Sequence, residues 1–179
     1  MFNYNGACAA RKPNFRANLS QNEDHMAPSQ DGIAVLLPLI VGAATTACTI
    51  VIHALALMTI VHFVRREHRL GLAGVHFWKD VSIVASIALL ALAAHLTEIA
   101  GWAWVISLCG QVPDFAAAFY HSALNYTTLG DCDPVTSPSW KLLGPLEAAD
   151  GMLMFGISTA MLFAVIQRLL QTRFSSDQT

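Results

Sequence analysis

Three long apolar stretches dominate the chain, and more polar segments separate them. They cover residues 33–64, 77–108 and 142–170. A helix needs about 20 apolar residues to cross the hydrocarbon core of a bilayer, so each stretch is long enough, with tilt or with extension beyond the membrane. We therefore predict an all-α membrane protein with three transmembrane helices.

A shorter and more polar element lies between the second and third stretches. Gly110 and Pro113 end the second stretch, and Asp114 is a suitable N-cap for a short helix over residues 115–125. Residues 126–133, which follow, are too polar to form a span. Irregular backbone at membrane depth survives only where it is buried in protein or lines a water-filled path. We interpret residues 111–141 as a re-entrant pore helix, a filter loop and an outer mouth.

Basic residues set the expected orientation. They cluster after the first stretch and again at the end of the third, as Arg65, Arg66, Arg69, Lys79, Arg168 and Arg173. Cytoplasmic loops of membrane proteins carry an excess of Lys and Arg, so we expect an extracytoplasmic N-terminus and a cytoplasmic C-terminus. Trp78, Trp102 and Trp104 are expected at the membrane interfaces. The polar residues 1–31 are expected to form a disordered extracytoplasmic tail, and residues 32–110 the two outer helices with their basic link.

Composition narrows the function. Of the 179 residues, 55% are hydrophobic and 12% are charged, and the net charge of −2 gives no reason to expect a nucleic-acid partner. No nucleophile–base pair or phosphate-binding loop is found, so we expect no enzymatic activity. The four cysteines lack the spacing of a zinc site. Cys109 and Cys132 are both expected on the outer side, where a disulfide between them and a free Cys132 thiol remain open alternatives.

Four motifs carry a resemblance to a known family. They are His95-x-x-Glu98, the run Phe119-Tyr120-His121-Ser122 leading into Tyr126-Thr127-Thr128-Leu129-Gly130, Trp140-Lys141-Leu142-Leu143-Gly144, and Glu147-Ala148-Ala149-Asp150-Gly151. Together they resemble the pore module of tetrameric potassium-type channels, particularly the small bacterial three-span ion channels, over residues 33–172. The resemblance implies a homotetramer in a bacterial inner (plasma) membrane, with residues 142–179 as the pore-lining inner helix and a short cytoplasmic tail.

The filter departs from the family pattern. Potassium channels carry Thr-Val-Gly-Tyr-Gly-Asp, whose carbonyl oxygens replace the hydration shell of the ion. The aligned residues here end in Asp131-Cys132-Asp133, which resembles the non-selective sodium–potassium channel with Asp in place of Tyr. We expect a weakly selective pore for Na⁺ and K⁺, with calcium permeation and calcium block both open, and no other cofactor. The expected ion-binding residues are Thr127, Thr128, Leu129, Gly130, Asp131, Cys132 and Asp133.

Further residues receive roles from their positions. Asp150, Gly151 and Gly156 on the third helix are candidates for the cavity or for gating, with a hydrogen bond from Asp150 to a neighbouring helix as the alternative. The expected supports of the filter are His95, Glu98, Tyr126, Trp140 and Glu147. His95 and Glu98 share one helix face, and we expect them to brace the pore helix or the filter from behind, through Tyr126 or through a backbone amide.

Two other functions remain open. A membrane metal- or haem-binding protein would use His53, His62, His95 and Glu98, although His53 and His62 are expected to be packing or interfacial residues. A structural subunit with a degenerate filter would not conduct. For residues 128–133 alone, an ordinary exposed turn is the competing interpretation, because Gly-Asp and Asp-Pro are turn signals.

Overall fold

The computed structural model describes residues 30–70, 77–112, 114–130 and 140–176. Within these ranges the chain forms helices and no strand. In order they are α2 (Gln30–Arg69), α3 (Phe77–Leu108), α4 (Phe115–Tyr126) and α5 (Leu143–Ser176). The all-α prediction is confirmed for this part of the chain, and α3 has the bounds predicted for the second apolar stretch.

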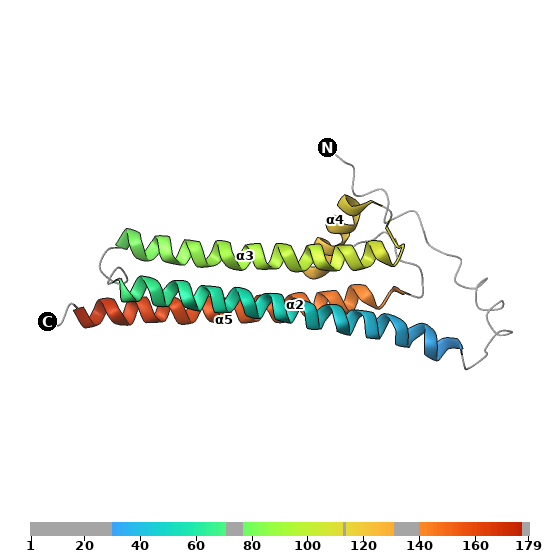
Figure 1. Ribbon diagram of the computed structural model, residues 1–179, viewed down its shortest axis with the longest axis horizontal. Helices are drawn as coiled ribbons and strands as arrows, with labels where there is room; N and C mark the ends of the chain where they lie inside the picture. The colour runs from blue at the N-terminus through green and yellow to red at the C-terminus, as the bar shows by residue number, and fades with distance from the viewer. Residues whose placement is uncertain (1–29, 71–76, 113, 131–139, 177–179) are drawn as a thin grey trace.

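The three long helices lie side by side, with α2 and α5 running opposite to α3 (Figure 1). Each is long and apolar enough to cross a membrane. The prediction of a multi-pass membrane protein is confirmed at this level. Both α2 and α5 extend past their predicted ends into the basic sequence, because Arg, Glu and Gln are good helix formers once a helix has been started.

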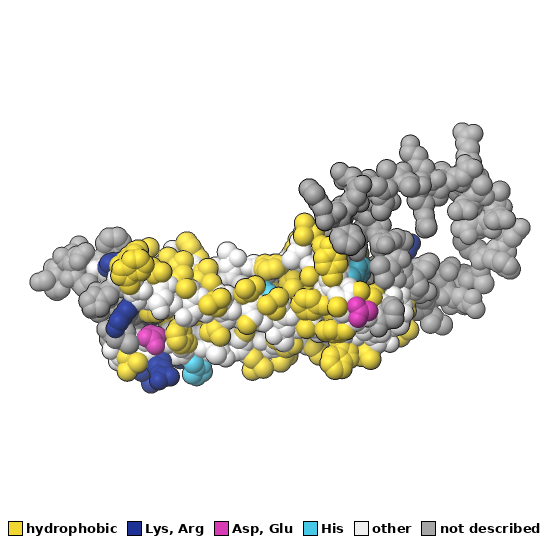
Figure 2. Space-filling view, turned by 90° about the horizontal axis from the view of Figure 1, so that it is seen from above, with side chains coloured by type: hydrophobic (Ala, Val, Ile, Leu, Met, Phe, Trp, Pro, Cys, Tyr) yellow, Lys and Arg dark blue, Asp and Glu magenta, His cyan; other side chains and the backbone are white. Residues whose placement is uncertain are grey.

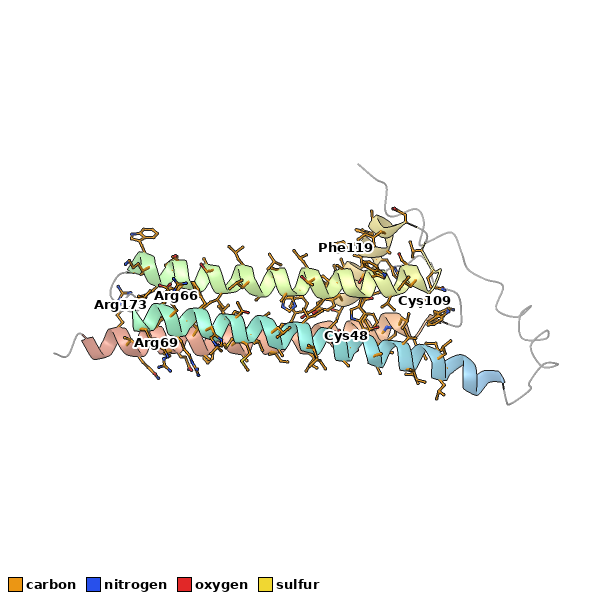
Figure 3. All side chains as sticks on the ribbon, in the orientation of Figure 1. Cys48, Arg66, Arg69, Cys109, Phe119 and Arg173 are labelled. Atoms are coloured by element: carbon orange, nitrogen blue, oxygen red, sulfur yellow. The ribbon has the colours of Figure 1, made fainter. Side chains whose placement is uncertain are left out.

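Apolar side chains cover the outside of the bundle. Val51, Leu55 and Met58 on α2 and Leu89 on α3 are among the large exposed hydrophobic residues. Figure 2 shows hydrophobic side chains along the length of the visible face, with Lys and Arg gathered mainly at one end. Figure 3 places Arg66, Arg69 and Arg173 at this end, and Cys109 and Phe119 at the other. An apolar belt between polar ends is what a bilayer requires of a protein surface.

Two groups of buried apolar residues hold the helices together. Toward the basic end, α2, α3 and α5 meet through Ile60, Ile83, Ile87, Val165 and Leu169. Toward the other end, α3, α4 and α5 meet through Ile99, Trp102, Tyr126, Leu143 and Met154. The short helix α4 therefore has its own place in the core.

The helix α4 turns back along α3. Its N-cap is the predicted residue, Asp114. The Oδ2 atom of Asp114 accepts a hydrogen bond from the Ala117 amide at 3.2 Å. Ala118 packs with Ala103 and Ile106 of α3. One turn later the Ser122 hydroxyl donates to the Ile99 carbonyl oxygen at 3.0 Å. Each turn of α4 thus lies deeper along α3, away from the end at Leu108.

Candidate functional site

The last residue of α4, Tyr126, is fixed in a buried polar cluster. Its hydroxyl donates to Glu98 Oε2 on α3, which is one of the two contacts that we expected for Glu98. Both side chains are fully buried. Glu98 lies ten residues from the end of α3 at Leu108, which corresponds to about 15 Å along the helix axis. The end of α4 therefore lies well inside the length of the bundle.

Two histidines and a serine complete this cluster. His53 Nδ1 on α2 is 2.8 Å from Glu98 Oε1, and His95 Nδ1 is 3.3 Å from Glu98 Oε2 and 3.1 Å from the Tyr126 hydroxyl. The Ser158 hydroxyl on α5 lies 3.1 Å from the Nε2 atoms of both histidines. All four helices thus contribute to one hydrogen-bonded network, which we call the His–Glu–Tyr cluster (His53, His95, Glu98, Tyr126 and Ser158).

The contacts of this cluster can be compared with the number of hydrogens that its side chains carry. Its ring of contacts joins His53 to Glu98, Glu98 to Tyr126, His95 to the Glu98–Tyr126 pair, and Ser158 to each histidine. Each contact needs one hydrogen, but two neutral imidazoles and two hydroxyls beside a carboxylate supply one too few. A cluster in which every one of these contacts is a hydrogen bond would hold one additional proton. It would be electrically neutral as a whole, which suits a group of buried polar side chains.

A second buried carboxyl group holds the middle of α4. Glu147 on α5 is fully buried, and its Oε1 is hydrogen bonded to the Ser122 hydroxyl, which also contacts the Ile99 carbonyl oxygen. A hydroxyl carries a single hydrogen, so both contacts form only when Glu147 carries its proton. Glu147 thus holds α4 one turn before Tyr126.

A third carboxyl group, Asp150, joins α5 to α2 and α3. Its Oδ2 accepts hydrogen bonds from Trp102 Nε1 and from the Thr49 hydroxyl, each at 2.8 Å. The side chain is buried, and it does not lie on the exposed face of α5. The expectation that Asp150 contributes charge to a cavity is therefore wrong for this structure, and the alternative of a hydrogen bond to neighbouring helices is observed. Trp102, expected at a membrane interface, is likewise a buried donor inside the bundle.

Gly151 and Gly156, the two glycines of α5 that are candidates for the cavity or for gating, have different surroundings. A Cβ atom at Gly151 would overlap the Tyr126 carbonyl oxygen and would lie 2.9 Å from the carbonyl carbon. A Cβ atom at Gly156 would meet nothing within 4 Å. Gly151 therefore permits the close approach of α4 to α5, whereas Gly156 lies on the exposed face, and α5 is continuous through both.

The backbone after α4 has an unusual course. Thr128 and Gly130 both have positive φ angles, of 63° and 71°. The amides of Thr127, Thr128 and Gly130 donate back to carbonyl oxygens of α4, at 3.1, 2.8 and 3.1 Å. Within the described ranges, no hydrogen bond reaches the carbonyl oxygens of residues 127–130. These residues are exposed, Leu129 to 76%. The segment thus presents backbone acceptors and few donors to its surroundings.

The other residues singled out in the sequence are considered in turn. Asp131, Cys132 and Asp133 fall outside the described residues, and Cys109 is a free thiol. Trp140 is half-buried against the apolar group around Tyr126. His62 is exposed, and its Nδ1 contacts the Met58 carbonyl oxygen.

Three of the four residues expected for a metal site lie together. Ligand atoms of His53, His95 and Glu98 all lie within 4.8 Å of one another and are buried. His62 does not join them, because residues nine apart lie on nearly opposite sides of a helix. His53, which we expected to be a packing or interfacial residue, is buried and belongs to the cluster.

The sequence grouped His53 with His95 and Glu98 only in the metal-binding alternative. It did not identify Thr49 as a partner of Asp150, or Ser158 as a partner of the two histidines. One pattern in the sequence could have placed Thr49 and His53 inside the bundle. Thr49 and His53 lie four residues apart, on one face of an apolar helix, and polar side chains within a membrane usually face the bundle interior.

Comparisons with models of protein families, with curated proteins and with solved structures found no match for this chain.

Proposed function

We propose that the chain is one subunit of a homotetrameric cation channel of weak selectivity among Na⁺ and K⁺. In this proposal α4 is a re-entrant pore helix that enters from the extracytoplasmic side. The filter begins at Thr127 and continues through Asp133. The basic ends of α2 and α5 then lie in the cytoplasm, and the membrane is the bacterial inner membrane.

One observation carries this proposal: the exposed residues 127–130, whose carbonyl oxygens accept no hydrogen bond from the described part of the chain, lie deep along a bundle of helices long enough to span a membrane. The preceding residue, Tyr126, contacts Gly151, eight residues into α5, or about 12 Å from its start. Unpaired backbone at that depth is not tolerated against lipid. Covering it with water and with further copies of the chain removes the conflict. Oxygen atoms without neighbouring donors are the ligands that alkali cations accept.

The supporting framework fits a filter that must hold a fixed diameter. Tyr126 is tied to Glu98, Ser122 is tied to Glu147, and Gly151 receives the end of α4. Three independent contacts fix the twelve-residue helix immediately before Thr127. Four copies around one axis would close the path, since a single loop per chain encloses nothing and closed cyclic symmetry is the common solution.

The proposal is tested by recording from the purified protein in planar bilayers under bi-ionic conditions with Na⁺, K⁺ and Ca²⁺. We expect currents with little preference between Na⁺ and K⁺. We also expect Asp131→Asn to weaken calcium binding or block, with Asp133→Asn tested beside it. Asp114→Asn is the matched control, because it removes one carboxylate near the same end while Asn remains a good N-cap. An unchanged response to Ca²⁺ in Asp131→Asn would remove this residue from the ion site.

Oligomeric state provides a separate test. Light scattering in mild detergent should give the mass of four chains. A stable monomer or dimer would contradict the proposal, because the carbonyl oxygens of residues 127–130 would then have no enclosed path to line.

A metal-binding protein is the second candidate, favoured by the group His53, His95 and Glu98. The hydrogen bonds already made by these side chains argue for the channel framework instead. Metal analysis of dialysed protein separates the two. Stoichiometric metal together with an absence of ion flux in liposomes would favour the second candidate. A lack of both bound metal and ion flux would indicate a structural subunit that does not conduct.

A further inference from the structure

A groove between α2 and α5 lies at the basic end of the bundle, away from the His–Glu–Tyr cluster. It encloses about 570 Å³. Its lining is apolar toward one end and cationic toward the other, and includes Val61, Val64, Arg65 and Arg69 from α2 and Ala164 and Arg168 from α5. No residue of the proposed ion path takes part in it.

The order of side chains along the groove is the same on both helices. On α2, Val61 is followed by Arg65 and Arg69 at intervals of four residues, which keeps them on one face. On α5, Ala164 is followed by Arg168 at the same interval. Both helices run toward the basic end. The groove is therefore apolar where it is deepest in the bundle and cationic where the bundle ends.

The arginines of the groove are available to a ligand. Arg173, farther along α5, lies 3.9 Å from Asp80 Oδ2 and over the ring of Phe77. In contrast, Arg65, Arg69 and Arg168 make no hydrogen bond or ion pair with another side chain in the part of the chain that the structure describes. Three guanidinium groups around one groove favour a partner with negative charge, and guanidinium matches the geometry of phosphate.

We propose that this groove binds an anionic phospholipid, with its phosphate at Arg65, Arg69 and Arg168 and an acyl chain along Val61, Val64 and Ala164. A free phosphate would use the arginines but would leave the apolar part uncovered. A phospholipid matches both parts in the observed order. Its class is a lipid with net negative charge, because a zwitterionic headgroup adds a cation that the arginines repel.

Binding of phosphatidylglycerol and phosphatidylcholine with identical acyl chains to the full-length protein in detergent tests the proposal, with native mass spectrometry as readout. We expect phosphatidylglycerol to bind about tenfold more tightly, since each basic residue near an anionic headgroup contributes about a fivefold gain before geometric losses. The variant Arg65→Gln/Arg69→Gln/Arg168→Gln should bind both lipids equally weakly. Circular dichroism verifies that the helices remain formed.

Two further variants distinguish lipid binding in the groove from attraction of the lipid to a charged surface. Arg66→Gln is the matched control, because Arg66 belongs to the same basic run but does not line the groove, and it should change binding less than about twofold, as expected for a surface charge outside the site. Ala164→Phe keeps every charge while filling the apolar part, and it should weaken phosphatidylglycerol binding. Excess inorganic phosphate should not displace the lipid.

Other outcomes would overturn the proposal. The single variant Arg65→Gln is made for comparison with Arg66→Gln. If both weaken lipid binding equally, the lipid responds to surface charge alone. If Ala164→Phe binds phosphatidylglycerol as the unmodified chain does, no acyl chain occupies the groove. If inorganic phosphate displaces the lipid, the site takes a free anion. None of these measurements depends on ion conduction, so the outcome is independent of the proposed channel function.

Discussion

The carbonyl oxygen of Tyr126 lies where a side chain at position 151 would project, so Gly151 of α5 is in direct contact with the end of α4. The Tyr126 hydroxyl is bonded to Glu98 at the same time. One residue is thus held from two sides, by α5 at its backbone and by α3 at its side chain. Any segment that follows Tyr126 begins from a fixed point inside the bundle.

Gly151→Ala should disturb this contact. The new methyl group overlaps a backbone atom, which cannot rotate away, so α4 or α5 must shift. We expect a loss of stability of about 1–3 kcal/mol, as for other overpacked positions. Thermal unfolding in detergent measures it. Gly156→Ala is the matched control on the same helix and should be neutral or stabilising by up to about 1 kcal/mol, because a helical Gly gains from a Cβ in open space. Equal effects of the two substitutions would contradict the contact.

Tyr126→Phe should remove one donor from the His–Glu–Tyr cluster while keeping the ring packed. Glu98 then has a buried oxygen atom without that donor, and we expect a loss of about 1–3 kcal/mol. The same variant should alter ion selectivity in bilayer recordings if the cluster holds the filter. Tyr120→Phe is the control, since it removes a hydroxyl from an exposed position of the same helix. A conducting protein with unchanged selectivity would restrict Glu98 and Tyr126 to a folding role.

Glu147→Gln should be nearly neutral in thermal unfolding, within about 1 kcal/mol. A Gln amide can donate to Ser122 as a protonated carboxyl group does, so both contacts of the Ser122 hydroxyl persist. Glu147→Ala removes the partner and leaves a cavity, and should cost about 2–5 kcal/mol. If Gln and Ala were equally destabilising, Glu147 would be an ionised acceptor, and the hydrogen count given above would be wrong.

Local features of the fold were accessible from sequence, whereas contacts between helices, apart from the expected approach of Tyr126 to Glu98, were not. The bounds of α3 and the N-cap at Asp114 follow from an apolar run and a capping residue, both readable within a few positions. The pairing of Asp150 with Trp102 and Thr49 joins positions 48 and 101 residues apart. It depends on how each helix is rotated and shifted against its neighbours. Since α2 and α5 are apolar nearly all round, their sequences do not reveal which face is inward.

Burial of Cys109 near the end of α3 raises the pKa of its thiol. The thiolate is the reactive form, so alkylation of the folded protein should be slower at neutral pH than alkylation of the unfolded chain, and its rate should still rise above the ordinary thiol pKa. The folded state favours the neutral thiol of Cys109. The contribution of this thiol to the stability of the fold is therefore present at low pH. It is lost as the pH rises through the thiol pKa of the unfolded chain and then through that of the folded chain. Maleimide labelling in a background with the other cysteines changed to Ser measures the rate, and a rate equal to that of the unfolded chain would contradict the burial.

Thr128 and Gly130 should respond in opposite directions to substitution, because both have positive φ but only one is glycine. A β-branched residue in this conformation costs on the order of 1–3 kcal/mol, so Thr128→Gly should recover about 1 kcal/mol after the greater entropy of the unfolded glycine chain is deducted. Gly130→Ala places a Cβ in the same conformation and should cost about 1–2 kcal/mol. Thermal unfolding tests both signs.

Strain retained at Thr128 is explained if its hydroxyl or carbonyl oxygen binds an ion. Thr128→Gly should then gain stability while losing conductance or selectivity. A variant that gains stability with unchanged currents would place the ion path elsewhere.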